Sequence, residues 1–221
     1  MKVAPQVNFT RMDPEVRKAH LVNATLTCLK QHGFQGMSVR KICAQAGVSP
    51  GLISHHYSGK DALVAEAYQT ITRKVMGQLR VAMAENVGEG VRTQLSAFFQ
   101  ASFSEKLLNT FLLEAWLAFW GAVKTAETIR EAHDKSYKEY RSILEQVLEQ
   151  LALEQGWQQF NYQLAAISLT ALIDGLWLEH GLDPETFTPA EGVLICEAWV
   201  DGLLAGGYQR LCQSEAAKAL D

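Results

Sequence analysis

Apolar residues recur every three to four positions along most of the chain. Between residues 14 and 33 they share one helical face: Leu21, Ala24, Thr25, Cys28 and Leu29. Asp13 followed by Pro14 is typical of a helix start, and Gly33 is typical of a helix end. No stretch alternates apolar and polar residues with the period of two that a half-buried strand requires. We therefore expect an all-α protein.

Two shorter helices are expected directly after this one. The first begins after Ser38, ends at Gly47 and has an apolar inward face: Val39, Ile42, Cys43 and Ala46. The second begins with Ser49 and Pro50, a capping residue followed by the residue favoured at the first helical position. Because only Gly47 and Val48 separate the two helices, they must cross steeply, as in a helix-turn-helix.

The second of these short helices has two different faces. Ile53 and Tyr57 lie four residues apart and are expected to anchor it inward. Its outward face consists of small or polar residues: Pro50, Gly51, Ser54 and His55. Small residues let a helix backbone come close to a DNA groove, and serine and histidine side chains bond base edges or phosphates. Leu52 is a candidate for contact with a thymine methyl group.

The rest of the chain continues the helical pattern. Ser58 and Gly59 break the third helix, and a long helix is expected over residues 60–86. The later segments of helical length are 91–104, 107–124, 126–154, 158–181 and 189–213. The sequence therefore predicts about nine helices, with no internal repeat.

Charge is distributed unevenly along the 221 residues. Residues 1–60 hold eight lysines and arginines against two acidic residues, whereas the remainder holds 12 against 22. The net charge of −4 therefore combines a basic quarter with an acidic body. A basic region suits a polyanionic partner. Arg40 and Lys41 precede the outward face and Lys60 follows it, so cations flank that face on both sides.

A basic stretch is usually only solvated surface, and that interpretation predicts a helical subdomain without DNA affinity. Here the capped helix, the Ala-Gly-Val turn and the Ser-Pro-Gly start occur together with the basic residues, at helix-turn-helix spacing. Residues 14–66, which include "AGVSPGLISHHYSGKDAL", resemble the N-terminal domain of the tetracycline-repressor (TetR) family of bacterial transcription regulators.

The resemblance implies which residues contact DNA. Four fall at positions where the family contacts DNA: Ser49, Gly51, Ser54 and His55. His56 occupies a position where the family often has a phosphate-contacting tyrosine, and Lys60 matches a lysine that contacts the DNA backbone. The chain departs from the family at position 54, where serine replaces a frequent tyrosine.

The resemblance also implies a homodimer and a ligand cavity in the C-terminal domain. The family dimerises by pairing its last two helices into a four-helix bundle, and these would be about residues 158–181 and 189–213. Residues 201–207, "DGLLAGG", offer small side chains for close helix approach, although glycines near a helix end are equally typical of fraying.

Two segments of the acidic body are almost free of charge. Residues 107–123 contain only Glu114, and residues 163–178 contain only Asp174. Aromatic residues accompany these carboxylates: Trp116, Phe119, Trp120 and Trp177. A carboxylate among aromatic rings suits a quaternary ammonium ligand, since a desolvated cation over an aromatic face gains about 2 kcal/mol. Aromatic residues at helical spacing are also typical of an ordinary core, so the pattern leaves both interpretations open.

Helix geometry favours Asp174 over Glu114 as the counter-charge. Glu114 and Trp116 lie about 200° apart around a helix, whereas Asp174 and Trp177 share a face. "EAWLAFWGAV" and "LAAISLTALIDGLWLEHGL" resemble the choline-responsive BetI group of the family, which represses glycine-betaine synthesis genes. That resemblance implies choline as the effector. An apolar effector suited to the tryptophans and leucines is the alternative.

Other kinds of chemistry find little support. No P-loop, GxSxG, HExxH or EF-hand pattern occurs, and Cys28 with His32 supplies too few ligands for a metal. The four cysteines lack a CxxC spacing and residues 1–10 lack a signal peptide, so we expect reduced thiols in a cytoplasmic protein. The apolar run 164–178 is too short to span a bilayer. No enzyme activity, metal, cofactor or membrane partner is predicted.

These observations predict a DNA-binding domain over residues 1–60, with a linking helix from 60 to 86, and a ligand-binding and dimerisation domain over residues 61–221. The expected function is that of a homodimeric repressor that leaves its operator DNA when a small molecule binds. Regulation of another operon, activation in place of repression, and a ligand-binding protein or enzyme without DNA binding are the rival interpretations.

Overall fold

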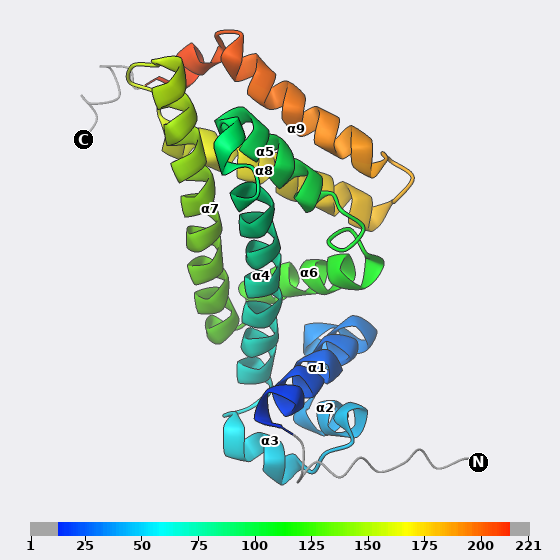
Figure 1. Ribbon diagram of the computed structural model, residues 1–221. Coiled ribbons are helices and arrows are strands. Elements are labelled where there is room, and N and C mark those ends of the chain that lie inside the picture. The colour runs from blue at the N-terminus through cyan, green and yellow to red at the C-terminus, as the bar shows by residue number, and fades with distance from the viewer. Residues whose placement is uncertain (1–12, 213–221) are drawn as a thin grey trace. The chain divides into compact units, whose positions relative to one another are not determined.

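A computed structural model describes residues 13–212 of the chain (Figure 1). The nine α-helices of these residues are α1 (Pro14–Gly36), α2 (Val39–Ala46), α3 (Pro50–His56), α4 (Lys60–Ala84), α5 (Val91–Ser102), α6 (Thr110–Val123), α7 (Glu127–Gln155), α8 (Tyr162–Leu182) and α9 (Pro189–Leu204). Two short 3-10 helices accompany them, η2 (Val87–Glu89) and η3 (Gly207–Leu211). The predicted all-α fold is confirmed.

Capping residues determine where the first helices begin and end. The Asp13 side chain accepts a hydrogen bond from the Glu15 amide at 2.8 Å, and the Ser38 hydroxyl accepts one from the Lys41 amide at 3.3 Å. Gly47 ends α2 in the left-handed conformation, with φ 64°. Ser49 occupies the cap position of α3, but its side chain makes no capping hydrogen bond.

Three helix boundaries of the later chain differ from those expected. α6 begins at Thr110, because Asn109 caps it by accepting a hydrogen bond from the Leu112 amide at 2.9 Å. α8 begins at Tyr162, because Gly156 and Gln159 have positive φ angles of 67° and 57° that a continuing helix does not allow. α9 ends at Leu204 and not near residue 213.

The chain forms two compact units. Among the described residues, the first comprises 13–74 and 114–136, and the second comprises 75–113 and 137–212. The first unit therefore contains α1, α2, α3 and most of α6, and the second contains α5, α8 and α9, while α4, α6 and α7 contribute residues to both.

The core of the first unit contains the apolar face predicted for α1. Leu21, Cys28 and Leu29 are all at most 2% exposed, and Ile42 of α2 and Ile53 of α3 are completely buried. Glu66 of α4 binds Lys18 of α1 at 2.7 Å, so an ion pair connects α1 to α4.

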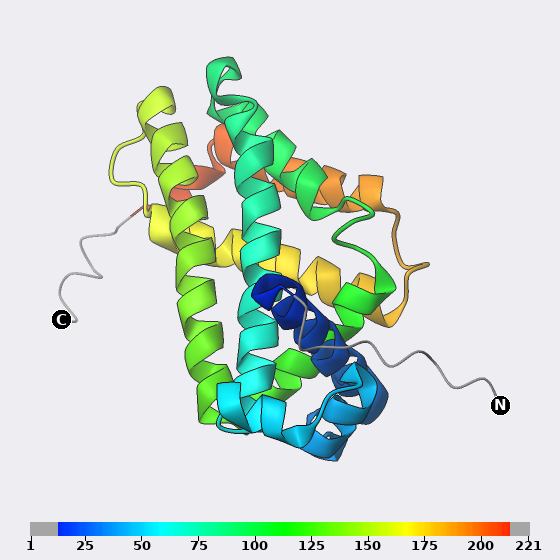
Figure 2. The ribbon, with the colours of Figure 1, turned by 60° about the horizontal axis from the view of Figure 1, so that its bottom comes forward.

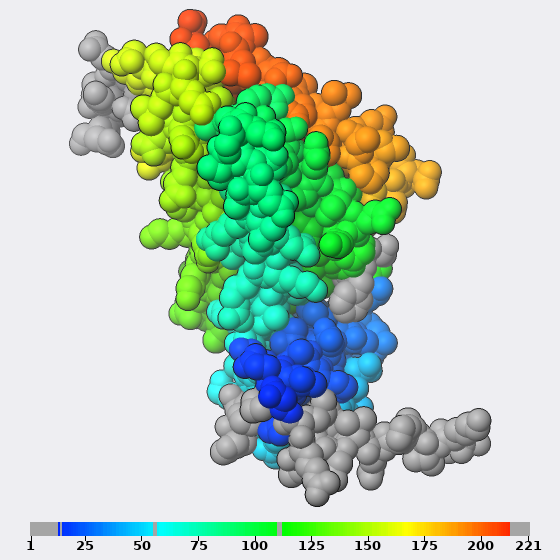
Figure 3. Space-filling model, viewed as in Figure 1, coloured from blue at the N-terminus to red at the C-terminus, as the bar shows by residue number. Residues whose placement is uncertain are grey.

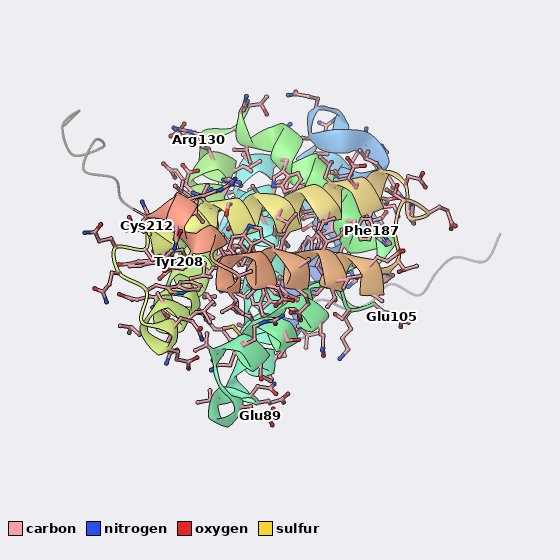
Figure 4. The ribbon with its side chains drawn as sticks, turned by 90° about the horizontal axis from the view of Figure 1, so that it is seen from above. Glu89, Glu105, Arg130, Phe187, Tyr208 and Cys212 are labelled. Atoms are coloured by element: carbon pink, nitrogen blue, oxygen red, sulfur yellow. The ribbon has the colours of Figure 1, made fainter. Side chains whose placement is uncertain are left out.

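The second unit packs α5 and α8 against α9. Arg92 of α5 binds both Glu197 and Asp201 of α9, the latter at 2.8 Å. Gly192 of α9 lies so close to Phe103 that an added Cβ would come within 2.6 Å of that ring, which explains why glycine is needed there. α8 and α9 run side by side, as Figure 4 shows in a view along the chain's long helices.

The end of the described chain folds back onto the connection between α7 and α8. Gly206, at φ 105°, turns the chain after α9, and η3 follows. The Tyr208 ring stacks on Trp157 with centroids 4.4 Å apart, and Cys212 pairs with Phe160 in an isolated antiparallel bridge. Figure 4 shows Tyr208 and Cys212 together at this end of the unit.

Candidate DNA interface and effector site

The outward face of α3 is exposed, as its sequence predicts. Ser49, Pro50, Gly51 and Ser54 are exposed and Leu52 is half-buried, whereas Ile53 between them is 0% exposed. α3 ends at His56, and Tyr57 follows in an extended conformation, half-buried, with its amide bonded to the Ile53 carbonyl at 2.8 Å. The side chains of His55 and His56 lie outside the described residues.

Hydrogen bonds fix the turn between α2 and α3. Figure 2 shows the two short helices next to each other. The Val48 amide bonds the Cys43 carbonyl at 3.0 Å, which closes the end of α2. The imidazole of His20 in α1 bonds the Ala46 carbonyl at 3.1 Å. The position of α3 is therefore fixed by apolar packing on one side and by backbone hydrogen bonds at the turn.

The three predicted cations lie at the ends of neighbouring helices. Arg40 and Lys41 are exposed in the first turn of α2, and the Lys41 ammonium donates to the Gly36 carbonyl at 2.7 Å. The Lys60 ammonium donates to the Phe34 carbonyl at 3.0 Å and lies 4.3 Å from the centroid of the Phe34 ring. Phe34 was not predicted, because nothing in the sequence pairs residues 26 positions apart.

Ser54 has a specific local hydrogen bond. Its hydroxyl donates to the Pro50 carbonyl at 2.8 Å, one turn earlier in α3. The proton of this hydroxyl is therefore engaged, while its oxygen lone pairs stay available on the exposed face.

The aromatic residues predicted for the effector site are divided between the two units. Trp116, Phe119 and Trp120 of α6 belong to the first unit, and Trp177 belongs to the second together with Asp174. Trp116 is 7% exposed, Phe119 is completely buried and Trp120 is half-buried.

In the first unit the predicted aromatic residues surround Tyr68 of α4. Trp116 stacks on the Tyr68 ring with centroids 5.6 Å apart, and Phe119 meets the same ring edge-on at 5.0 Å. Trp120 meets Trp116 edge-on at 6.5 Å. Glu114, which helix geometry separates from these rings, binds Lys30 of α1 at 2.5 Å. Its carboxylate is therefore used in an ion pair on the side of α6 that meets α1.

In the second unit Asp174 of α8 faces α7. Its Oδ2 accepts a hydrogen bond from the Tyr137 hydroxyl at 2.8 Å. Burial raises the pKa of Asp174 to about 6, against the lowering effects of the Tyr137 hydrogen bond and the positive charge of Arg141. Trp177, three residues further along α8, is 6% exposed. The sequence interpretation found Asp174 and Trp177 but not Tyr137 and Arg141.

The sequence gives only weak evidence that Tyr137 and Arg141 belong to the site. They lie at positions i and i+4 of α7 and share a face, but α7 also carries many other charged residues at the same spacing. Only the packing of α7 on α8 distinguishes this pair.

No helix within residues 13–212 is long and apolar enough to cross a membrane. In the same residues no three His, Cys, Asp or Glu side chains are placed to hold a metal ion. All four cysteines have free thiols, and three of them, Cys28, Cys43 and Cys196, are buried.

A helix-turn-helix with an exposed, cation-flanked second helix, joined to a larger helical part, defines the class of one-component transcription regulators. Comparison with known families agrees with this class. Residues 21–67 match the model of the bacterial regulatory proteins of the tetR family, and residues 91–205 match that of the C-terminal part of BetI-type transcriptional repressors. The chain belongs to the TetR family, with a C-terminal domain of the BetI type.

Individual relatives support the same assignment. The transcriptional regulator BetI of Yersinia pestis is 27% identical over 195 residues, which are 88% of this chain and 96% of the relative. A crystal structure of a protein from Pseudomonas aeruginosa PAO1, described as a transcriptional regulator, is 64% identical with a TM-score of 0.90, over 94% of this chain and all of that one. A protein from Saccharomonospora viridis, solved in complex with choline, is 18% identical with a TM-score of 0.68, over 86% of this chain and 97% of its own, and shares the fold. These families and relatives are transcription regulators and not enzymes.

Proposed function

We propose that the protein is a dimeric repressor that holds its operator through α2, α3 and the start of α4, and leaves it when a small molecule binds the C-terminal part. The observation that carries the proposal is the exposed face of α3 on a completely buried Ile53, with Lys41 and Lys60 at the neighbouring helix starts. Residues 1–60 would then bind DNA and residues 61–221 would bind the effector and dimerise, in the cytoplasm where the operator is.

Phosphate contacts supply most of the proposed affinity. Their candidates are Arg40, Lys41, His56 and Lys60. An ammonium group has three donors, so the bonds from Lys41 to Gly36 and from Lys60 to Phe34 leave donors for DNA. Both lysines are thereby held in place before DNA binds, which reduces the side-chain entropy that binding must remove.

Base contacts are proposed for Gly51, Leu52, Ser54 and His55, with Ser49 and Pro50 at the helix start close to the backbone. The structure of α3 adds a direction to the Ser54 contact. Because its proton is given to the Pro50 carbonyl, the hydroxyl oxygen would accept from DNA. In the major groove the donors are the N4 amino group of cytosine and the N6 amino group of adenine. Ser54 should therefore favour those bases over guanine and thymine at its position.

Salt dependence tests the DNA-binding part of the proposal. We expect binding to a palindromic site from the gene's own upstream region to weaken steeply as salt increases. Lys60→Ala should weaken binding to every sequence alike and reduce the slope of log K against log salt by about one, because one phosphate contact is lost. Fluorescence anisotropy over a salt series measures both quantities.

The exposed Lys138 of α7 provides the control. Lys138→Ala should leave affinity and slope unchanged, and thermal denaturation of both variants shows whether Lys60→Ala also loosens the fold. A wild-type affinity that does not change with salt concentration would refute DNA binding.

The effector is proposed to bind at Asp174 and Trp177, with choline as the first candidate. Two observations support this proposal: a buried carboxylate beside a buried indole on α8, and the 27% identity to BetI over most of the chain. The other predicted residues, Trp116, Phe119 and Trp120, lie with Tyr68 in the first unit and are proposed as a separate aromatic site. Binding would favour a dimer state whose recognition helices no longer match major grooves about 34 Å apart.

Choline should raise the melting temperature of the wild-type protein and should not raise that of Asp174→Ala or Trp177→Ala, because each variant removes one element of the cation site. Differential scanning fluorimetry over a choline series gives the comparison. An equal shift in all three proteins would exclude this site. An apolar effector is the second candidate, since the α6 aromatic residues surround Tyr68 while Glu114 is bound to Lys30.

A further inference from the structure

Arg141 lies close to the proposed effector site and has an unused donor. It stands on the same face of α7 as Tyr137, and its guanidinium carbon lies 5.7 Å from the centroid of the Tyr137 ring. The Arg141 Nε atom is buried and makes no hydrogen bond in the structure. Within residues 13–212 no carboxylate lies within ion-pair distance of this guanidinium.

Arg141 as a whole is half-buried, but a buried Nε without an acceptor is an unusual feature. Buried polar groups are nearly always hydrogen-bonded, and each group left unpaired in a native structure calls for an explanation. No neighbouring group accepts a hydrogen bond from the Arg141 Nε in the structure, and the guanidinium lies over the face of the Tyr137 ring. The planar guanidinium fork matches a carboxylate, which can accept two parallel hydrogen bonds from it.

The cluster of Tyr137, Arg141, Asp174 and Trp177 therefore presents both signs of charge. Asp174 has one oxygen bonded by Tyr137, and Arg141 is near enough for its charge to act on the Asp174 carboxyl group. A ligand with a positive charge alone would satisfy Asp174 but would be repelled by Arg141. A ligand with a carboxylate alone would meet the opposite conflict.

We infer that the effector is a small zwitterion that carries a quaternary ammonium group beside Asp174 and the Trp177 ring, and a carboxylate on the Arg141 guanidinium. This inference rests on the proposed placement of the effector site at Asp174. The preferred effector is then a molecule that carries both charges, and no longer a simple cation. The buried indole of Trp177, on the same face of α8 as Asp174, favours a methylated ammonium over a strongly hydrated primary one.

Three probes of nearly equal shape separate the charges. Choline has the ammonium alone, 3,3-dimethylbutanoate has the carboxylate alone, and glycine betaine has both. We expect the full-length protein to bind glycine betaine at least about tenfold more tightly than either of the others in isothermal titration calorimetry, since a charge-assisted bidentate bond adds this much or more.

Substitution of Arg141 should remove this preference. Arg141→Gln is expected to weaken glycine betaine about tenfold or more and to leave choline unchanged or tighter, because the repelling charge is lost. Arg141→Lys keeps the charge without the fork and should restore only part of the preference. Arg130→Gln is the matched control, because Arg130 lies on the same helix but pairs with Glu127 in the first unit (Figure 4).

The outcomes distinguish this inference from the function on which it rests. If choline binds as tightly as glycine betaine, the inference of a zwitterionic effector is refuted, while the proposed cation site at Asp174 is supported. If 3,3-dimethylbutanoate binds as tightly as glycine betaine, the site binds an anion, and neither a zwitterion nor a cation is the effector. If no probe binds a protein that still binds its operator, Asp174 is not the effector site, and the inference fails with it while the DNA-binding function stands.

Discussion

Asp174 is a carboxyl group whose acidity differs between the folded and the unfolded chain. Its pKa rises from 3.8 to about 6 on folding, chiefly because it is buried. Well below pH 3.8 the group is protonated in both states. Between pH 3.8 and about 6 the unfolded chain is ionised while the folded chain stays mostly protonated, so the folded state loses stability over this window, and the loss is complete above it.

Asp174→Asn should remove this loss. Asparagine keeps an oxygen that can accept from Tyr137 but has no charge to desolvate. The free energy of unfolding of the variant relative to the wild type should therefore increase between pH 4 and pH 7, by up to about 3 kcal/mol. Urea denaturation at several pH values provides the measurement.

Glu149→Gln, on the exposed surface of α7, is the control for a carboxylate lost without burial. If the difference between Asp174→Asn and the wild type stays constant from pH 4 to pH 7, the carboxyl group is not buried in the way described. Choline affinity in the wild type should increase over the same window, because the cation requires the ionised carboxylate.

Single residues differed in how far the sequence revealed them. Asp174 stood out as the only charge among residues 163–178, and its burial with Trp177 agrees with that observation. Glu114 stood out in the same way, but its helical position excluded it from the aromatic face, and it binds Lys30. Tyr137 lies 37 positions before Asp174 in the sequence, and Arg141 is on the same helix as Tyr137. Only tertiary packing reveals that they are neighbours of Asp174.

At the scale of elements, α9 shows what local sequence signals can and cannot predict. Its start at Pro189 follows a capping box, in which Thr188 accepts from the Glu191 amide at 3.3 Å and Glu191 accepts from the Thr188 amide at 2.7 Å. Its end was predicted too late, because "DGLLAGG" allowed either helix contact or fraying. The structure gives these glycines another role, since Gly206 turns the chain and Gly207 packs against the helix it has just left.

Gly207→Ala should destabilise the protein. An alanine Cβ would lie 2.6 Å from the Gly202 carbonyl oxygen, and this oxygen belongs to the backbone and cannot rotate away. We expect a loss of about 1–3 kcal/mol in the free energy of unfolding, with faster amide exchange in η3.

Gly202→Ala is the matched control within the same segment. No atom lies within 4 Å of its added Cβ, and Gly202 is in the interior of α9, so alanine should stabilise the helix slightly. Equal effects of the two substitutions would show that crowding at Gly207 does not matter.

The boundaries of the other helices follow the same distinction. Asp13, Ser38 and Gly47 act through bonds within four residues, and the sequence located the helices that they limit. Ser49 looked equally strong as a cap, yet α3 begins there without a side-chain bond, because the tight turn and the buried Ile53 already determine its start. The late starts of α6 and α8 depend on turns of irregular backbone that periodicity does not describe.

At the scale of the whole molecule, the exposed apolar side chains of α8 and α9 bear on the proposed dimer. Leu164 and Ile167 of α8 are 45% and 46% exposed, and Leu194 and Ile195 of α9 are 64% and 40% exposed. Figure 3 shows α9, in orange, along the surface of the second unit. Apolar side chains gathered on two adjacent helices are typical of an interface between protein chains.

Leu194→Glu should weaken the dimer, because it places a charge among these side chains without a partner. We expect the dimer dissociation constant to increase at least about tenfold, with a matching loss of affinity for a palindromic operator. Analytical ultracentrifugation measures the first effect and anisotropy the second.

Leu153→Glu offers a control of equal chemistry, since Leu153 of α7 is 76% exposed on another helix. A dimer that tolerates Leu194→Glu as well as Leu153→Glu would place the interface elsewhere.

The fold class could be predicted because nearly every segment has helical periodicity and because one turn is short enough to force a crossing. The family followed from the resemblance of residues 14–66 to the N-terminal domain of the TetR family. The division of the molecule into two compact units could not be predicted in the same way. α4 and α7 are continuous helices that contribute to both, and a continuous helix shows no boundary in its sequence.

The bond from Lys60 to the Phe34 carbonyl joins the end of α1 to the start of α4, 26 residues apart, at 3.0 Å. This bond closes the chain segment that contains α2 and α3 into a loop, and the free energy of the closed loop depends on the strength of this bond. A DNA phosphate that attracts the same ammonium would act on that bond. If Lys60 contacts the operator as proposed, operator binding and the local stability of the helix-turn-helix are thermodynamically linked through one side chain.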